Sequence, residues 1–88
     1  MVPFETAWKR ITSLEGETFT QIRGGEFRFE VVGTTLKLDR TNQLVSRNQL
    51  EEAFALLPFE NTGPLQHLRA PSYLFAILTD RRVRGSDW

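Results

Sequence analysis

The stretch from Thr18 to Arg40 constrains the fold of this chain most, because it reads as a three-stranded antiparallel meander. Its first two strands are rich in aromatic and β-branched residues and flank Gly24-Gly25, a pair that supplies the positive φ angles of a two-residue hairpin loop. A second turn at Gly33-Thr34 leads into the third strand. Because a tight loop fixes which residues face each other, the two turns predict the register of the whole meander.

The predicted register gives the meander one apolar face and one charged face. Its facing pairs are Ile22 with Phe27, Thr20 with Phe29, Phe19 with Glu30, Val32 with Thr35, Val31 with Leu36, Glu30 with Lys37, Phe29 with Leu38 and Arg28 with Asp39. The apolar face then consists of Ile22, Phe27, Phe29, Val31, Leu36 and Leu38. Opposite charges on the other face specify the register, because a slip of one residue would bury every charge. Phe19 is the exception there, and either the N-terminal segment covers it or a partner contacts it.

Length and composition indicate one domain, spanning residues 1–88, without covalent cross-links. Eighty-eight residues suffice for one hydrophobic core, and the lack of cysteine excludes disulfides, thiolate metal sites and a cysteine nucleophile. Eleven basic and eleven acidic residues give a net charge of zero, so no overall field draws the chain onto nucleic acid or an anionic membrane. Without a signal-peptide pattern or an apolar run near the roughly 20 residues that cross a bilayer, we expect a cytoplasmic protein with no membrane partner.

Two helices are predicted around the meander. Apolar residues at helical spacing predict the first over Pro3–Leu14, with Gly16 as its stop. The second is predicted over Arg47–Leu57, because Ser46 and Gln49 have the spacing of a capping box. A hydrophobic staple supports the same start and is formed by Val45 and Leu50.

The C-terminal third is expected to hold a loop, a third helix and a flexible tail. Phe59–Ala70 has no sustained period and reads as a loop. Ser72–Thr79 is apolar on nearly all sides, so periodicity alone also allows a buried strand. A helix over Pro71–Thr79 is favoured because proline suits a first helical turn and basic residues follow the C-terminal end. Residues 81–88 are polar and are predicted to be flexible.

The predicted fold class is α+β, with a three-stranded antiparallel meander packed against two or three short helices. The succession EGETFTQIRGGEFRFEVVG, SRNQLEEAFALLP and APSYLFAILTD resembles small prokaryotic domains of uncharacterised function, over residues 8 to 81. The resemblance implies an α+β fold and carries over no catalytic or binding residue.

No constellation in the sequence predicts an enzyme, a metal or a cofactor. His67 is the only histidine and has no partner at ligand spacing. Glu51 and Glu52 are adjacent on the predicted helix, so their side chains point to different sides and do not form a paired-carboxylate site. Their position near the start of the helix is already explained by the helix dipole. The glycines do not form a phosphate-binding loop and read as turn residues.

Two binding functions are predicted instead. The leading hypothesis is a non-catalytic interaction module for a protein partner or a second copy, because large apolar residues outnumber those that so small a core needs. Its candidate interface residues are Phe19, Phe59, Tyr73 and Trp88. The alternative is a modest nucleic-acid-binding module, since a helix start flanked by basic and amide side chains can hold a phosphate. Its candidate contacts are Arg40, Asn42, Arg47, Asn48, Arg81, Arg82 and Arg84.

Overall fold

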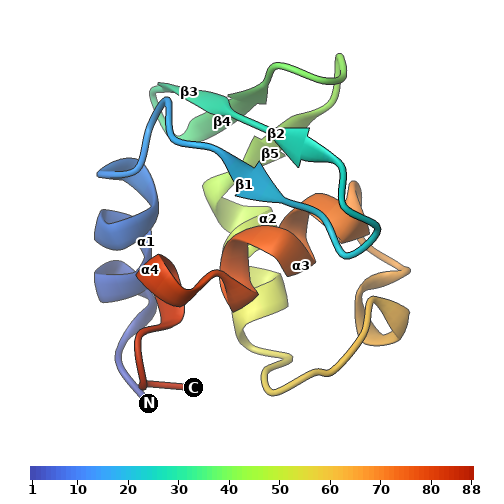
Figure 1. Cartoon of the computed structure of the whole chain (residues 1–88). Coiled ribbons are helices and arrows are strands. Elements are labelled where there is room, and N and C mark those ends of the chain that lie inside the picture. The colour runs from blue at the N-terminus through green and yellow to red at the C-terminus, as the bar shows by residue number, and fades with distance from the viewer.

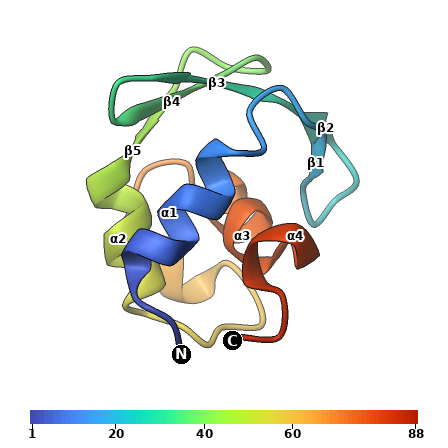
Figure 2. The ribbon, with the colours of Figure 1, turned by 90° about the vertical axis from the view of Figure 1, so that its left-hand side faces the viewer.

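A curved antiparallel sheet forms one layer of the structure and helices form the layer beneath it (Figures 1 and 2). The computed structural model describes residues 1–88. The sheet has the strand order β3-β4-β5, with β3 at Phe29–Val32, β4 at Thr35–Leu38 and β5 at Leu44–Ser46. A separate ribbon pairs β1 (Phe19–Thr20) with β2 (Glu26–Phe27). The helices are α1 (Phe4–Thr12), α2 (Arg47–Phe54), the 3-10 turn η1 (Gly63–Leu65), α3 (Pro71–Thr79) and α4 (Arg81–Arg84). The predicted α+β class is confirmed.

The hairpin of β3 and β4 has the predicted register. Its facing pairs are Phe29 with Leu38, Glu30 with Lys37, Val31 with Leu36 and Val32 with Thr35. Gly33 takes a φ of 63° in the turn, a left-handed conformation that costs glycine little. Where the ladder ends, the Arg28 backbone N–H donates to Asp39 Oδ1 at 2.8 Å and the Asp39 N–H donates to the Arg28 carbonyl at 3.1 Å.

The predicted register of the first hairpin is wrong. Phe19 faces Phe27 instead of Glu30, so the ribbon is shifted by three residues. Because side chains alternate between faces, a shift by an odd number of residues turns the opposite face of the first strand toward the core. Phe19 is therefore fully buried, while Ile22, predicted to lie in the core, is 59% exposed. Residues 21–25 form a wider loop than the predicted two-residue turn, and burial of the larger aromatic side chain favours this arrangement.

The third strand of the sheet is not the predicted one. Instead of the segment 18–23, β5 completes the sheet by pairing with the free edge of β4, and Val45 faces Leu36. The predicted strand over 26–32 is interrupted at Arg28, so β1 and β2 form their own ribbon, which contacts α3. Three residues are too short to show the alternation of a strand, and the sequence signal at Val45 was the staple of the following helix.

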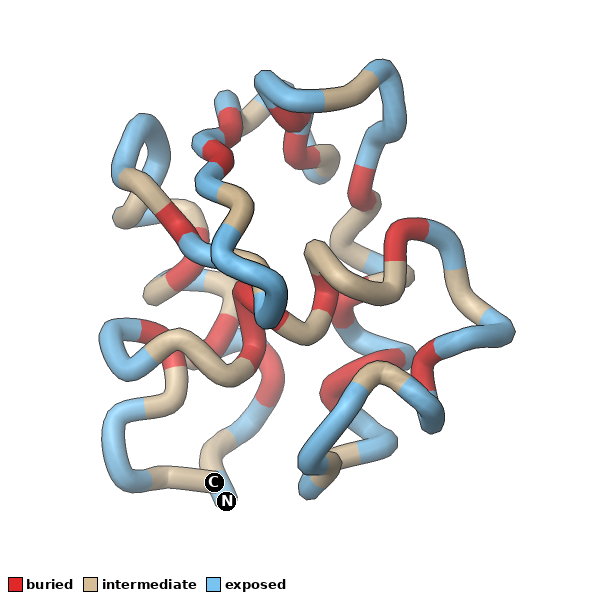
Figure 3. Tube along the Cα trace, turned by 45° about the vertical axis from the view of Figure 1, so that its right-hand side comes forward, coloured by how far each residue is buried: buried red, intermediate tan, exposed pale blue.

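The core lies between the sheet and the helices, and α3 runs through its middle. Leu74, Ile77 and Leu78 are fully buried on α3, and Leu65 anchors the preceding loop with no exposed surface. Buried residues occur in the strands as well as in the helices (Figure 3). Since every buried residue is apolar, the fold is held chiefly by the hydrophobic effect.

The predicted flexible tail is instead an ordered helix and cap. Residues 81–84 form α4, whose Val83 is fully buried. The Trp88 indole N–H donates to the Leu78 carbonyl at 2.7 Å. Arg10 of α1 pairs with Asp87 at 2.7 Å, which joins the two ends of the chain. These partners lie far apart in the sequence, so local polarity misled the prediction.

The first two helices are shorter than predicted. α1 spans Phe4–Thr12 and α2 spans Arg47–Phe54, each losing residues at its C-terminal end to turns. The capping box at the start of α2 is confirmed, because Ser46 Oγ accepts from the Gln49 N–H and the Gln49 side chain accepts from the Ser46 N–H. α3 spans the residues for which the sequence favours a helix over a strand.

Candidate functional site

The start of α2, predicted as an anion site, is occupied by groups of the protein itself. The N–H of Gln49 is bonded to Ser46 Oγ at 3.1 Å. Arg47 forms an ion pair with Glu5 of α1, and its guanidinium lies 5.1 Å from the centroid of the Phe4 ring. An arginine that is neutralised and stacked in this way joins α1 to α2 and has little charge left for a phosphate.

The other candidates near this helix do not gather around its start. Arg40 donates from Nη1 to the Glu26 carbonyl at 2.8 Å, so it ties the loop after β4 to β2. Asn42 and Asn48 are exposed. Asn42 lines an open hollow of about 520 Å³ together with Arg69. This hollow holds one guanidinium and no second charge, which is a weak attraction for a polyanion.

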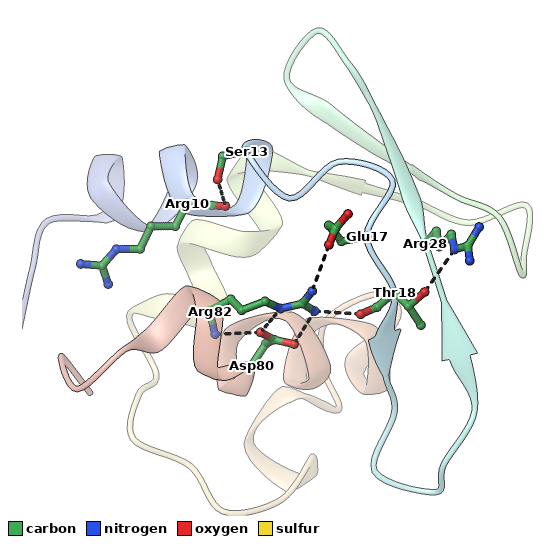
Figure 4. A network of polar contacts seen from close by, with 7 residues as sticks. All are labelled: Arg10, Ser13, Glu17, Thr18, Arg28, Asp80 and Arg82. Atoms are coloured by element: carbon green, nitrogen blue, oxygen red, sulfur yellow. Dashed lines mark hydrogen bonds and ion pairs between the residues drawn. The ribbon is translucent and has the colours of Figure 1, made fainter.

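Arg82 is the centre of a network that attaches α4 to β1 (Figure 4). Its Nε and Nη2 donate to the two carboxylate oxygens of Asp80, each at 2.9 Å. Nη2 also donates to the Thr18 carbonyl at 2.8 Å, and Glu17 lies 3.8 Å from Nη1. The guanidinium stands 4.7 Å from the centroid of the Phe19 ring. Arg82 is thus a structural clamp.

The ionisation of this pair follows from its geometry. Partial burial acts to raise the pKa of Asp80, but the hydrogen bonds from Arg82 and its positive charge outweigh it, so the pKa lies below the ordinary 3.8. The hydrogen bond to Asp80 raises the pKa of Arg82, against the opposing effect of its own desolvation. Both groups therefore stay charged at neutral pH.

The two groups of predicted basic contacts lie on different sides of α1 (Figure 2). α1 contacts α2 on one side and α4 on the other. On α4, Arg84 is half-buried and donates from Nε to the Trp88 carbonyl at 2.7 Å, whereas Arg81 is exposed. No single basic surface unites Arg47 with the α4 arginines, so the arrangement gives little support to nucleic-acid binding.

The aromatic residues predicted as an interface mostly complete the core. Phe19 has no exposed surface, so it cannot contact a partner as predicted. The other three are half-buried, each with an aromatic neighbour whose ring centroid lies within 6 Å. These ring pairs are Phe59 with Phe75, Tyr73 with Phe27 and Trp88 with Phe54. The apolar residues that seemed surplus in the sequence are largely used by the fold.

The outer face of the β3-β4-β5 sheet is the surface that the fold leaves uncovered. All helices lie on the opposite side of this sheet (Figures 1 and 2). Val32 is 55% exposed on this face and Leu44 is 50% exposed. Together with Thr35 and Lys37 they line a shallow hollow of about 380 Å³. We call this surface, with Glu30 beside it, the outer face.

Of the two apolar residues on this surface, only Val32 can be located from the sequence. The register of β3 and β4 already places Val32 on the side of Glu30 and Lys37, where an apolar residue breaks the pattern of charges. Leu44 comes beside Lys37 only because β5 joins the sheet, and no local pattern marks β5 as a strand. The apolar pair therefore became visible only in the structure.

Other kinds of site find little support. No group of three or more metal-ligating side chains of the His, Cys, Asp or Glu type is gathered anywhere in the chain. None of the helices combines the length and the apolar character needed to span a bilayer. Comparisons of the chain with protein-family models, with curated proteins and with solved structures find no match. Its function is therefore inferred from its own surface.

Proposed function

We propose that this chain is a non-catalytic interaction module that binds protein through the outer face, with Val32 and Leu44 as the apolar contacts. The carrying observation is that two large apolar side chains, each at least half exposed, line one hollow on a sheet face that no helix covers. Outward positions of such a sheet are ordinarily polar, so two exposed apolar residues that line the same hollow there favour a contact surface.

The chemistry of the hollow supports binding more than catalysis. Lys37 is its only titratable lining residue, and it is exposed to water. A shallow apolar surface with one flexible charge can exclude water from a protein contact, and each Å² of apolar area removed from water contributes about 25 cal/mol. A catalytic group would need a neighbour to polarise it and a site that excludes water.

Site-specific photo-crosslinking tests the proposal. A photoreactive benzoylphenylalanine at position 44 would be compared with one at position 56, in cells that naturally produce the chain. Leu56 is a matched control because it is also a leucine, is 39% exposed and lies just beyond α2, away from the sheet.

The proposal predicts a discrete crosslinked product from position 44 and none from position 56. The mass of the product identifies the partner: twice the mass of the chain indicates a second copy, and any other mass indicates a different protein. Equal crosslinking at both positions, or none at position 44, would reject the outer face as a binding surface.

The nucleic-acid alternative is proposed with less support. Arg47 and Arg82 hold α1 and α4 in place, so they offer few free charges to phosphates. Binding of labelled single-stranded or duplex nucleic acid that weakens steeply with salt would support this alternative, because such a salt dependence is the signature of phosphate contacts.

A further inference from the structure

The outer face carries two charges that face each other without forming an ion pair. Glu30 of β3 and Lys37 of β4 are directly opposite in the register, and both are exposed. Neither takes part in any of the chain's ion pairs. One row along, Val32 faces Thr35 in the same two strands. In both outward pairs, the β3 residue therefore faces a β4 residue that it can contact favourably: a negative charge faces a positive charge, and an apolar side chain faces the threonine.

This relationship makes the face complementary to itself. A twofold axis that runs between β3 and β4, parallel to both strands, places β3 of one copy over β4 of the other at the same height. The pairs of residues that face each other within one sheet are then also the pairs that meet between the two copies. Glu30 meets Lys37 of the second copy, and Val32 meets Thr35, whose methyl group offers an apolar contact. Leu44, one strand beyond Lys37, then lies at the rim of the contact, past the outer edge of β3 of the second copy.

We propose that the occupant of the outer face is a second copy of this chain, related by this twofold axis, and the inference rests on the proposed function. Charge selects this axis over the others. An axis between β4 and β5 would place Lys37 over Leu44, and an axis across the strands would place Val32 over Glu30. Both of these put a charge against an apolar side chain.

The edges of the sheet favour face-to-face contact over strand addition. The outer edge of β3 is occupied, because the Val31 N–H donates to Glu15 Oε2 at 2.7 Å and the Gly16 N–H donates to the Phe29 carbonyl at 3.0 Å. At the other edge, β5 has three residues, and the Ser46 N–H donates to Gln49. Short and capped edges do not accept another strand readily.

The contact is small, and its strength should reflect that. A few facing positions per copy bury much less than the roughly 800 Å² per partner of a standard interface. We therefore expect a weak dimer, with a dissociation constant on the order of 0.1 to 1 mM. Because the contact includes exposed charges, salt should weaken it.

A charge-exchange experiment tests the inference. Glu30→Lys gives the face two positive charges and Lys37→Glu gives it two negative charges, so each variant repels its own copy. When the two variants are mixed, the twofold axis brings opposite charges together at both positions. Sedimentation equilibrium on each variant, on their mixture and on the wild type would measure association, and circular dichroism would verify folding at these exposed positions.

The matched control keeps the net charges and moves them off the face. Glu52→Lys on α2 and Lys9→Glu on α1 alter exposed residues, and their mixture has the same opposite net charges. We expect the wild type to dimerise, each face variant to lose at least tenfold in association, and only the face mixture to recover it. The control variants should each dimerise as the wild type does.

The inference is overturned if the wild type stays monomeric to millimolar concentration, or if the folded face variants fail to associate when mixed. A monomeric wild type that still gives a crosslink from position 44 to another protein would overturn the second copy alone and leave the proposed function standing. A monomeric chain with no such crosslink would reject both.

Discussion

Arg82 and Asp80 share two hydrogen bonds, Nε to Oδ1 and Nη2 to Oδ2, both of 2.9 Å. The same guanidinium reaches the Thr18 carbonyl, 64 positions away in the sequence, at 2.8 Å. This contact makes α4 part of the fold, although its sequence reads as a polar tail.

Removal of the clamp should lower stability modestly. Arg82→Ala deletes the bonds to Asp80 and Thr18, and we expect a loss of about 1 kcal/mol in the free energy of unfolding, since 39% of the Arg82 side chain is exposed and solvent weakens such contacts. Urea unfolding provides the measurement. Arg81→Ala is the matched control on the same helix, because the exposed Arg81 side chain forms no hydrogen bond or ion pair. Equal losses for both variants would show that the clamp contributes nothing specific.

The same pair predicts how stability depends on pH. The pKa of Asp80 is lower in the folded chain than its ordinary value of 3.8, so the unfolded chain binds this proton first as the pH falls. The contribution of Asp80 is therefore complete above the unfolded pKa and is lost as the pH falls through the folded pKa. Asp80→Asn should flatten the decline of stability between about pH 5 and pH 2. An unchanged slope would contradict the assignment.

The corrected hairpin register is tested by a pair of substitutions. Phe19→Ala should cost about 3 to 5 kcal/mol, because it empties a fully buried site. Ile22→Thr should change stability by less than about 0.5 kcal/mol, since this side chain is 59% exposed. Thermal or urea unfolding of the two variants decides the register. The opposite ranking would restore the hairpin that the glycine pair predicts.

The capping box of α2 should contribute measurably to folding. Ser46→Ala removes the acceptor of the Gln49 N–H and should cost about 1 kcal/mol. Ser46→Asp should retain most of the stability, because aspartate accepts the same hydrogen bond. Urea unfolding of both variants tests this, and indistinguishable midpoints would mean that solvent satisfies the helix start equally well.

Local signals predicted the local parts of this fold. The turn at Gly33-Thr34 gave the correct register of β3 and β4, and the spacing of Ser46 and Gln49 gave the start of α2. Both signals act within a few residues, where chain geometry leaves few alternatives.

The long-range parts escaped prediction for a physical reason. The place of Phe19 depends on burial against the rest of the core, which outweighed the turn preference of the glycine pair. The order in α4 depends on Arg10 and Thr18, which belong to elements at the other end of the chain. For the site, Phe19 was the only apolar exception predicted on the charged face, although the register of β3 and β4 also puts Val32 there. Leu44 joins that face through pairing of β5 that no local signal marks.

The most direct test of the outer face is a dilution series of the wild-type chain followed by ¹H–¹⁵N NMR from millimolar to low micromolar concentration. A face-to-face dimer should give concentration-dependent amide shifts centred on Glu30, Val32, Thr35 and Lys37, with residues of α1 and α3 unchanged and with smaller shifts at high salt. Shifts centred on the helices, or no shifts at all, would contradict it.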